Sequence, residues 1–340
     1  MASGQRRTLM SIAGSGRLKS FGPRIANPAT LPANNANDVA FSPAGDYIAV
    51  AHLSSPAVSV YPWTGAYGAK VANPATIPAG NGYGVAFAPN GNYIAVGHSN
   101  SPYISVYPWT GSFGTRVANP AVLPTIRATS IAFTPGQNYI AVTHTSSPYI
   151  SVYPWNGAFG IRVANPATLP SASANSVAFS PDVNYIAVAH NTTPFISVYP
   201  WAGAFGAKIA NPASLPTGNG NKVAFSPSGN HIAISHDSSP YISVYPWSGA
   251  FGAKVANPAT LPVGDGNGVS FSPSGDYIAI ANNFSPTVSV YPWDGAFGAK
   301  IANPSPMPSS NGFDVAFSPG VDYVAVAHDS TPYVSVFPFV

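Results

Sequence analysis

The chain contains no cysteine and no glutamate, and charged residues make up only 7% of its 340 positions. Without cysteine, neither a disulfide nor a thiolate metal site can form. So little charge is typical of membrane or disordered chains, yet no apolar run approaches the roughly 20 residues that span a bilayer. Aromatic residues, which disordered chains lack, make up 12% of the sequence. We therefore expect a folded protein that does not insert into a membrane.

The N-terminus does not have the pattern of a cleaved secretion signal. Two arginines, Arg6 and Arg7, are followed by a broken apolar stretch over residues 9–13. The apolar core of a signal peptide is longer, at about 7–15 residues. We therefore expect the chain to be made in the cytoplasm and not exported by a signal peptide.

A repeat of 46 residues runs through the chain without insertion or deletion. The dipeptide Asn-Pro begins at Asn27, Asn73, Asn119, Asn165, Asn211, Asn257 and Asn303. All but two of the 37 prolines fall at five fixed positions of this repeat, so they punctuate turns and do not form a low-complexity tract. Seven units of this length indicate propeller blades, whose periods are about 40–50 residues.

One unit reads as four short strands. Residues 39–42 and 47–52 form a hairpin around a tight turn, 58–61 form a third strand ended by Pro62, and 69–72 form a fourth. The second of these strands is apolar on both faces, so neighbouring sheets must cover it on both sides. The sequence therefore predicts an all-β, seven-bladed β-propeller with four-stranded blades.

The two ends of the chain complement each other. The seventh unit stops at Val340, directly after its third strand, while residues 21–26 match the fourth-strand segment 67–72. We expect the N-terminal strand to complete the last blade, because this closes the ring and removes exposed strand edges. The predicted domains are a basic arm, 1–20, and the propeller, 21–340.

Two family resemblances follow from these segments. Val-Ala-Phe-Ser-Pro-Ala-Gly-Asp-Tyr-Ile-Ala-Val at 39–50 resembles the first hairpin of a WD40 blade, although Tyr-Pro-Trp stands where that family has Trp-Asp. The whole unit, with Ala-Asn-Pro-Ala-Thr-Leu-Pro, Tyr-Ile-Ser-Val-Tyr-Pro-Trp and Gly-Ala-Phe-Gly, resembles repeat propellers of tailed-bacteriophage virions. That second resemblance implies a structural or host-contacting part of a phage particle, made in the host cytoplasm and released by lysis.

A histidine ends the second strand of six units, with asparagine in the sixth unit: His52, His98, His144, His190, His236, Asn282 and His328. Equivalent atoms in neighbouring blades lie too far apart for one metal ion, whose bonds to histidine are about 2 Å long. We expect these imidazoles to hydrogen-bond the Ser/Thr-Pro link that follows them.

Tryptophan recurs after Tyr-Pro in six units: Trp63, Trp109, Trp155, Trp201, Trp247 and Trp293. Large aromatic plates of this kind pack well between blades. The alternative is a row of sugar-stacking sites, as in repeat lectins.

No reaction centre can be assembled from the sequence. Asp46, Asp276 and Asp322 occupy a turn position that is asparagine in most other units, which makes them turn formers. No carboxylate pair, Ser-His-Asp set or phosphate-binding loop is apparent. We expect no catalytic residues, no cofactor, no metal and no enzymatic activity.

The repeats differ most in the loop before the first strand. Tyr83, Arg127 and Phe313 stand out there from an Asn/Gly background, and Phe284 is an outlier in the link before the third strand of the sixth unit. Exposed aromatics and arginine are favoured in binding surfaces. These four residues are candidate binding positions, with neutral drift as the alternative.

The N-terminal arm is the strongest asymmetry of the chain. Arg6, Arg7, Arg17 and Lys19 precede the first acidic residue, Asp38. We expect this arm to dock the protein to other virion proteins of the capsid or tail, and not to nucleic acid.

The leading hypothesis is a non-enzymatic accessory protein of a tailed-phage virion, either a capsid decoration or a tail component. The alternative is a lectin-like propeller that contacts host surface glycans through its tryptophan row. A third possibility is a cellular WD40-like adaptor for peptides.

Overall fold

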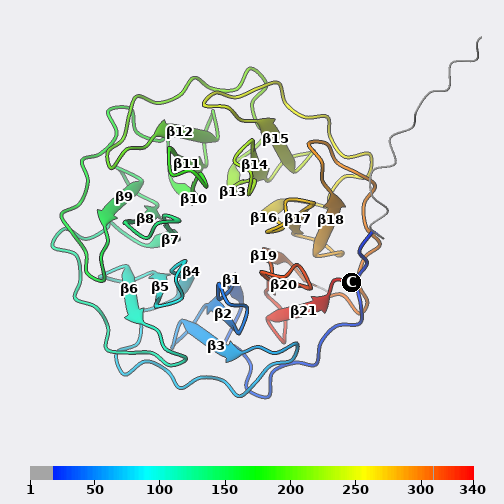
Figure 1. Cartoon of the computed structure of the whole chain (residues 1–340), viewed down its shortest axis with the longest axis horizontal. Coiled ribbons are helices and arrows are strands. Elements are labelled where there is room, and N and C mark those ends of the chain that lie inside the picture. The colour runs from blue at the N-terminus through cyan, green and yellow to red at the C-terminus, as the bar shows by residue number, and fades with distance from the viewer. Residues whose placement is uncertain (1–17, 309) are drawn as a thin grey trace, which may run out of the picture.

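The computed structural model describes residues 18–308 and 310–340, and shows seven antiparallel three-stranded sheets arranged around a central channel (Figure 1). The sheets are β1 (Ala36–Phe41), β2 (Tyr47–His52) and β3 (Val58–Pro62); β4 (Gly82–Phe87), β5 (Tyr93–His98) and β6 (Ile104–Pro108); β7 (Ala128–Phe133), β8 (Tyr139–His144) and β9 (Ile150–Pro154); β10 (Ala174–Phe179), β11 (Tyr185–His190) and β12 (Ile196–Pro200); β13 (Gly220–Phe225), β14 (His231–His236) and β15 (Ile242–Pro246); β16 (Gly266–Phe271), β17 (Tyr277–Asn282) and β18 (Val288–Pro292); β19 (Gly312–Phe317), β20 (Tyr323–His328) and β21 (Val334–Pro338). The predicted seven-bladed propeller is confirmed. Within these described residues, no helix has the length and apolar character needed to cross a membrane.

Each blade begins with a hairpin that contains a bulge, in which one residue of the first strand has no partner in the second strand. Val39 pairs with Val50 and Phe41 with Ile48, but the pairing shifts between Ala36 and Asp38. The same irregularity recurs in the first hairpin of every blade. Bulges of this kind redirect side chains, and this one lies beside the channel.

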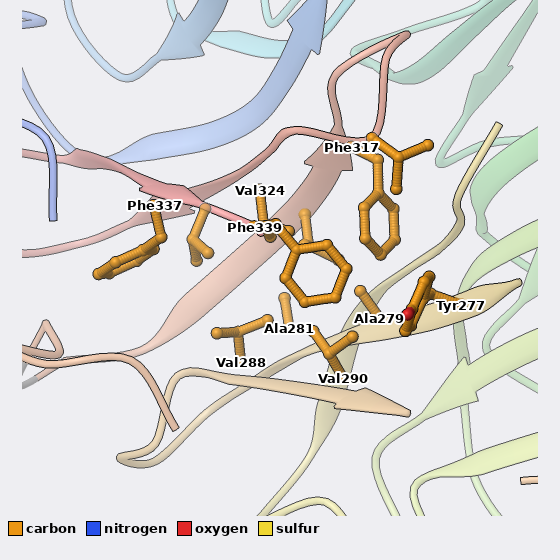
Figure 2. Packing of buried hydrophobic residues seen from close by; sticks show 12 residues of the cluster. Tyr277, Ala279, Ala281, Val288, Val290, Phe317, Val324, Phe337 and Phe339 are labelled. Carbon is orange, nitrogen blue, oxygen red and sulfur yellow. The ribbon is translucent and has the colours of Figure 1, made fainter. Parts of the chain in front are cut away.

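The core lies between blades. Ile48 and Val50 of the first blade pack against Ala325 and Ala327 of the seventh, so the large side chains of one β2-type strand face the small ones of its neighbour. Burying such an isoleucine contributes about 1.5–3 kcal/mol relative to leaving it exposed. Figure 2 shows the same packing between the sixth and seventh blades, where Phe339 occupies the place held by tryptophan in other blades.

The predicted fourth strand is wrong in detail. In the first blade, Gly68 N donates to Pro62 O and Val71 N to Val60 O, both at 2.8 Å. These donors are three residues apart, whereas the hydrogen bonds of a regular antiparallel ladder repeat every two residues. Pro62 has no N–H and therefore cannot donate the return hydrogen bond of a ladder pair. The segment therefore runs along the outside of β3 as an irregular strap, and the blades have three strands each.

The N-terminal segment closes the ring as predicted. Ser20 N donates to Val340 O at 2.6 Å and Val340 N to Ser20 O at 2.9 Å, and Gly22 N donates to Pro338 O at 2.8 Å. The ring of Phe21 lies 5.9 Å from that of Phe337 and 5.3 Å from that of Phe339. The blue N-terminal trace accordingly runs beside β21 in Figure 1.

Candidate functional site in the central channel

The residue that follows the bulge is where the sevenfold pattern breaks. The seven equivalent positions hold Asp38, Gly84, Ser130, Ser176, Lys222, Gly268 and Asp314. Four of them are small and uncharged, whereas three carry charge.

The three charged residues meet inside the channel. Lys222 Nζ lies 2.8 Å from Asp38 Oδ1 and 3.0 Å from Asp314 Oδ1. The lysine comes from β13, across the channel from the adjacent strands β1 and β19 (Figure 1). Asp38 Oδ2 also accepts a hydrogen bond from Val85 N at 2.8 Å. We call these three residues the channel triad.

The channel triad has one carboxylate more than its lysine can neutralise. Burial raises the pKa of Asp38, but the Lys222 ammonium and three hydrogen bonds outweigh it, so the net pKa is lowered. Burial and the nearby charge of Asp38 raise the pKa of Asp314 well above its ordinary value, despite the attraction of Lys222. Burial lowers the pKa of Lys222, but the two carboxylates raise it by more. Asp314 is therefore the carboxyl that binds a proton first as the pH falls, and with that proton bound the triad has no net charge.

A cavity of about 470 Å³ extends from the channel triad toward the turns between the first and second strands of the blades. Its walls combine the polar residues of the triad with apolar side chains that include Val39, Phe41, Val85 and Phe87. Such a cavity can hold a small molecule or a partner's side chain. In residues 18–308 and 310–340, no group of three or more histidine and aspartate side chains is placed to hold a metal ion.

No protein-family model and no curated protein matches this chain. Among solved structures, it is similar to the β-propeller domain of Cps50 (Swd1) from Myceliophteria thermophila, with a TM-score of 0.67, 12% identity, and coverage of 92% of this chain and 99% of that chain. At this identity the likeness concerns the fold alone. The chain has the fold of a seven-bladed β-propeller.

The expected contact between histidine Nδ1 and the following link forms for His52, His144 and His236, whereas the buried Nδ1 of His98, His190 and His328 has no hydrogen-bond partner. His144 Nδ1 lies 2.7 Å from Ser146 O, and His236 Nδ1 lies 2.8 Å from Ser238 O, which confirms the expected contact with the link in these blades. Sequence reasoning missed the second partner, a third-strand serine hydroxyl that lies 3.0–3.2 Å from Nε2 in all six blades that have histidine. Asn282 Nδ2 instead donates to Ser289 Oγ at 3.0 Å.

These histidines are neutral at physiological pH. Burial lowers the pKa of His52 below its ordinary value. In five blades, burial lowers the pKa to about 4: His98, His144, His190, His236 and His328.

The tryptophans pack between blades. Their exposed fractions are only 3–6%. Trp109, for example, meets the ring of Tyr47 from the preceding blade at 5.2 Å and that of Phe113 in its own blade at 5.0 Å. No broad indole face is left for stacking on a sugar, so a glycan site would have to use other residues.

Of the four outliers of the loop face, the structure brings Tyr83 and Arg127 into contact. In most blades, the bulged residue donates a hydrogen bond to a carbonyl of the next blade: Asn37 to Gly82, Thr129 to Ala174, Asn175 to Gly220, Asn221 to Gly266 and Asn267 to Gly312. Tyr83 and Phe313 occupy this position in the second and seventh blades. The Arg127 guanidinium lies 4.7 Å from the Tyr83 ring centre, so a cation–π contact joins the second and third blades. Phe284 is 61% exposed and lies beside Gly264.

Of the four predicted arm residues, Arg6, Arg7 and Arg17 lie outside the described residues. Lys19 is bound to the ring. Its Nζ donates to Val321 O at 3.0 Å and to Phe339 O at 2.9 Å, and its backbone N donates to Tyr277 Oη at 3.1 Å. The chain therefore joins the disc at the seam between the sixth and seventh blades.

Sequence reasoning also missed the channel triad, although the signal was present. Asp38, Lys222 and Asp314 share one position of the 46-residue repeat. Placing that position beside the channel required knowledge of the bulge.

Proposed function

We propose that this propeller is a non-enzymatic binding disc that acts as an accessory protein of a tailed-phage particle, docked through its basic N-terminal residues. The phage setting rests on the resemblance of the repeat unit. The observation that carries the docking role is the bonding of Lys19 to the seam between the sixth and seventh blades. This fixes where the chain leaves the disc, and the three arginines that precede Lys19 have no acidic residue among them.

The non-enzymatic part of the proposal is supported by how polar residues are used. The histidines are neutral and bonded to serine, and both carboxyls of the channel triad are paired with Lys222. Each histidine lies beside a serine hydroxyl, but the histidines are 0% and the serines 1% exposed, so no substrate can reach these pairs.

The docking test is a truncation that removes residues 1–17 and keeps Leu18 onward. Ser20 and Lys19 must stay, because they hold the closing segment. Copies of the protein per particle are then counted by quantitative mass spectrometry of purified virions. We expect strong loss of incorporation for the truncation and for the triple change of Arg6, Arg7 and Arg17 to Gln.

The matched control changes the same three arginines to Lys, which preserves charge. Retained incorporation for the Lys variant together with loss for the Gln variant supports electrostatic docking. Unchanged incorporation of the truncated protein would show that the disc docks by another surface.

A second candidate function, carbohydrate binding, is favoured by repeated grooves between blades. One groove of about 380 Å³ is lined by Asp46, Asn92 and Gly111, together with Trp109, whose residue is 5% exposed. A similar groove of about 350 Å³ includes Asp322. A glycan array tests this candidate: several equivalent sites per chain, one of them lost on Asp46→Ala, would favour it, and no bound glycan would reject it.

A further inference from the structure

A ring of seven cations surrounds the propeller at one position of the repeat. The residues are Arg24, Lys70, Arg116, Arg162, Lys208, Lys254 and Lys300. Each lies in the strap that follows the outside of the third strand, as shown by the bond from Val71 N to Val60 O. In Figure 1 these third strands and straps form the perimeter. We call this set the rim cations.

The charges of the protein are sorted by surface. Outside the N-terminal arm, only Lys222 and Arg127 are cations that do not belong to the rim. The ten aspartates lie elsewhere: Asp46, Asp182, Asp276, Asp294 and Asp322 in the turns of one face, Asp237, Asp265 and Asp329 in the loops of the other, and Asp38 and Asp314 in the channel. The rim is therefore cationic and the two faces are acidic.

The rim cations are half-buried without an acidic partner. In the described part of the chain, none of them forms an ion pair with a carboxylate; the ion pairs found there belong to Lys19 and Lys222. Burial lowers the pKa of Lys70, Lys208, Lys254 and Lys300. A partly desolvated cation of this kind gains from an incoming anion, because its own fold offers none.

Several of these amines are also held in position. Lys70, Lys208 and Lys254 each donate through Nζ to the side-chain oxygen of the asparagine three residues later, Asn73, Asn211 and Asn257. Charges held at the same position of successive blades are suited to a ligand whose charges also repeat.

We propose that the rim cations bind a flexible linear polyanion of the acidic-polysaccharide class. The ligand must curve around a disc whose radius of gyration is on the order of 20 Å, whereas duplex DNA is stiff over about 500 Å. Single-stranded nucleic acid binds through aromatic stacking, but the aromatic ring three residues before each cation packs against the tryptophan or phenylalanine of its own blade. A flexible polysaccharide meets both constraints.

The test measures binding of dextran sulfate, with uncharged dextran, free sulfate and duplex DNA as comparison ligands. The protein used in this test is truncated to begin at Leu18, so that the charges of residues 1–17 do not contribute to binding. Changing three, five and then all seven rim cations to Gln should weaken binding stepwise, by about fivefold per cation. The dependence of affinity on salt should flatten in parallel.

A charge-matched variant separates position from net charge. It carries the seven Gln changes and seven Lys residues in the turns between the first and second strands, including Asn92→Lys and Asn230→Lys. Near-ultraviolet circular dichroism checks that each variant is folded. The proposal requires that this variant does not recover dextran sulfate binding.

Recovery of binding would show that only net charge matters and would overturn the proposal. Equal affinity for duplex DNA, lost with the same variants, would replace the polysaccharide by nucleic acid. Equal occupancy by free sulfate would reject a multivalent ligand. Because residues 1–17 are absent throughout, failure here is distinguishable from failure of arm-mediated docking.

Discussion

The histidine row makes the propeller sensitive to acid, and one blade shows how to measure this. His190 is fully buried, its Nε2 lies 3.0 Å from Ser197 Oγ, and burial lowers its pKa to about 4. The sixth blade has asparagine at the same place, and Asn282 Nδ2 donates to Ser289 Oγ at 3.0 Å. His190→Asn should therefore keep the hydrogen bond to serine and remove the titrating ring.

The sign follows from proton binding. Between pH 6.5 and about 4, the unfolded histidine binds a proton that the folded one excludes, so the free energy of unfolding falls as the pH falls. From pH 7 to pH 5 the loss is about 2 kcal/mol for each histidine. For the five histidines whose pKa is about 4, the loss is on the order of 10 kcal/mol, comparable with the whole stability of a domain.

The measurement is urea unfolding at pH 7 and pH 5, followed by tryptophan fluorescence. The difference between the two pH values should shrink by about 2 kcal/mol in His190→Asn and grow by a similar amount in the reciprocal variant Asn282→His. Asp314, whose pKa burial raises, acts in the opposite direction, because its folded form binds the extra proton as the pH falls. It contributes equally to all three proteins and cancels. An identical pH dependence in the three would refute the reasoning.

Three further outcomes follow from the packing. Lys222→Met should cost about 3–5 kcal/mol, because two buried carboxylates lose their counterion, and adding Asp314→Asn should recover part of this in urea unfolding. Phe21→Ala should cost about 3 kcal/mol and open the closing blade first, seen as faster hydrogen exchange in β21 than in β9. Phe284→Ser should change the free energy of unfolding by less than about 0.5 kcal/mol, because Phe284 is 61% exposed.

The fold could be predicted because the same pattern of large and small apolar residues recurs in all seven units of the sequence. Ile48 and Val50 alternate with alanine in a strand that is apolar on both faces, and only a ring of sheets provides neighbours for both. The closure could be predicted because residues 21–26 repeat the segment that the seventh unit lacks. Both conclusions depend on period and side-chain size, which a sequence displays directly.

The fourth strand and the channel triad could not be predicted, because both depend on backbone register. Residues 69–72 have strand composition, yet they do not form a regular ladder with β3. Pro62 has no N–H to donate, and the donors Gly68 N and Val71 N are three residues apart. Lys222 and Asp38 are 184 positions apart, and a one-residue bulge decides whether their side chains meet. Alternation alone does not reveal that bulge, since a shift of one residue reverses every side chain.

Recurrence through the repeat is not by itself evidence of a structural role. His190 recurs and is buried, with its ring bonded to Ser197; Trp109 recurs and is enclosed by aromatic rings. Lys208 recurs equally, but it is half-buried on the perimeter and forms no ion pair within the described chain. The fold encloses these histidine and tryptophan rings, whereas the rim cations are half-buried and form no ion pair at any blade of the described chain. That difference, which only the structure shows, is the physical reason to look for a partner of this propeller at its rim.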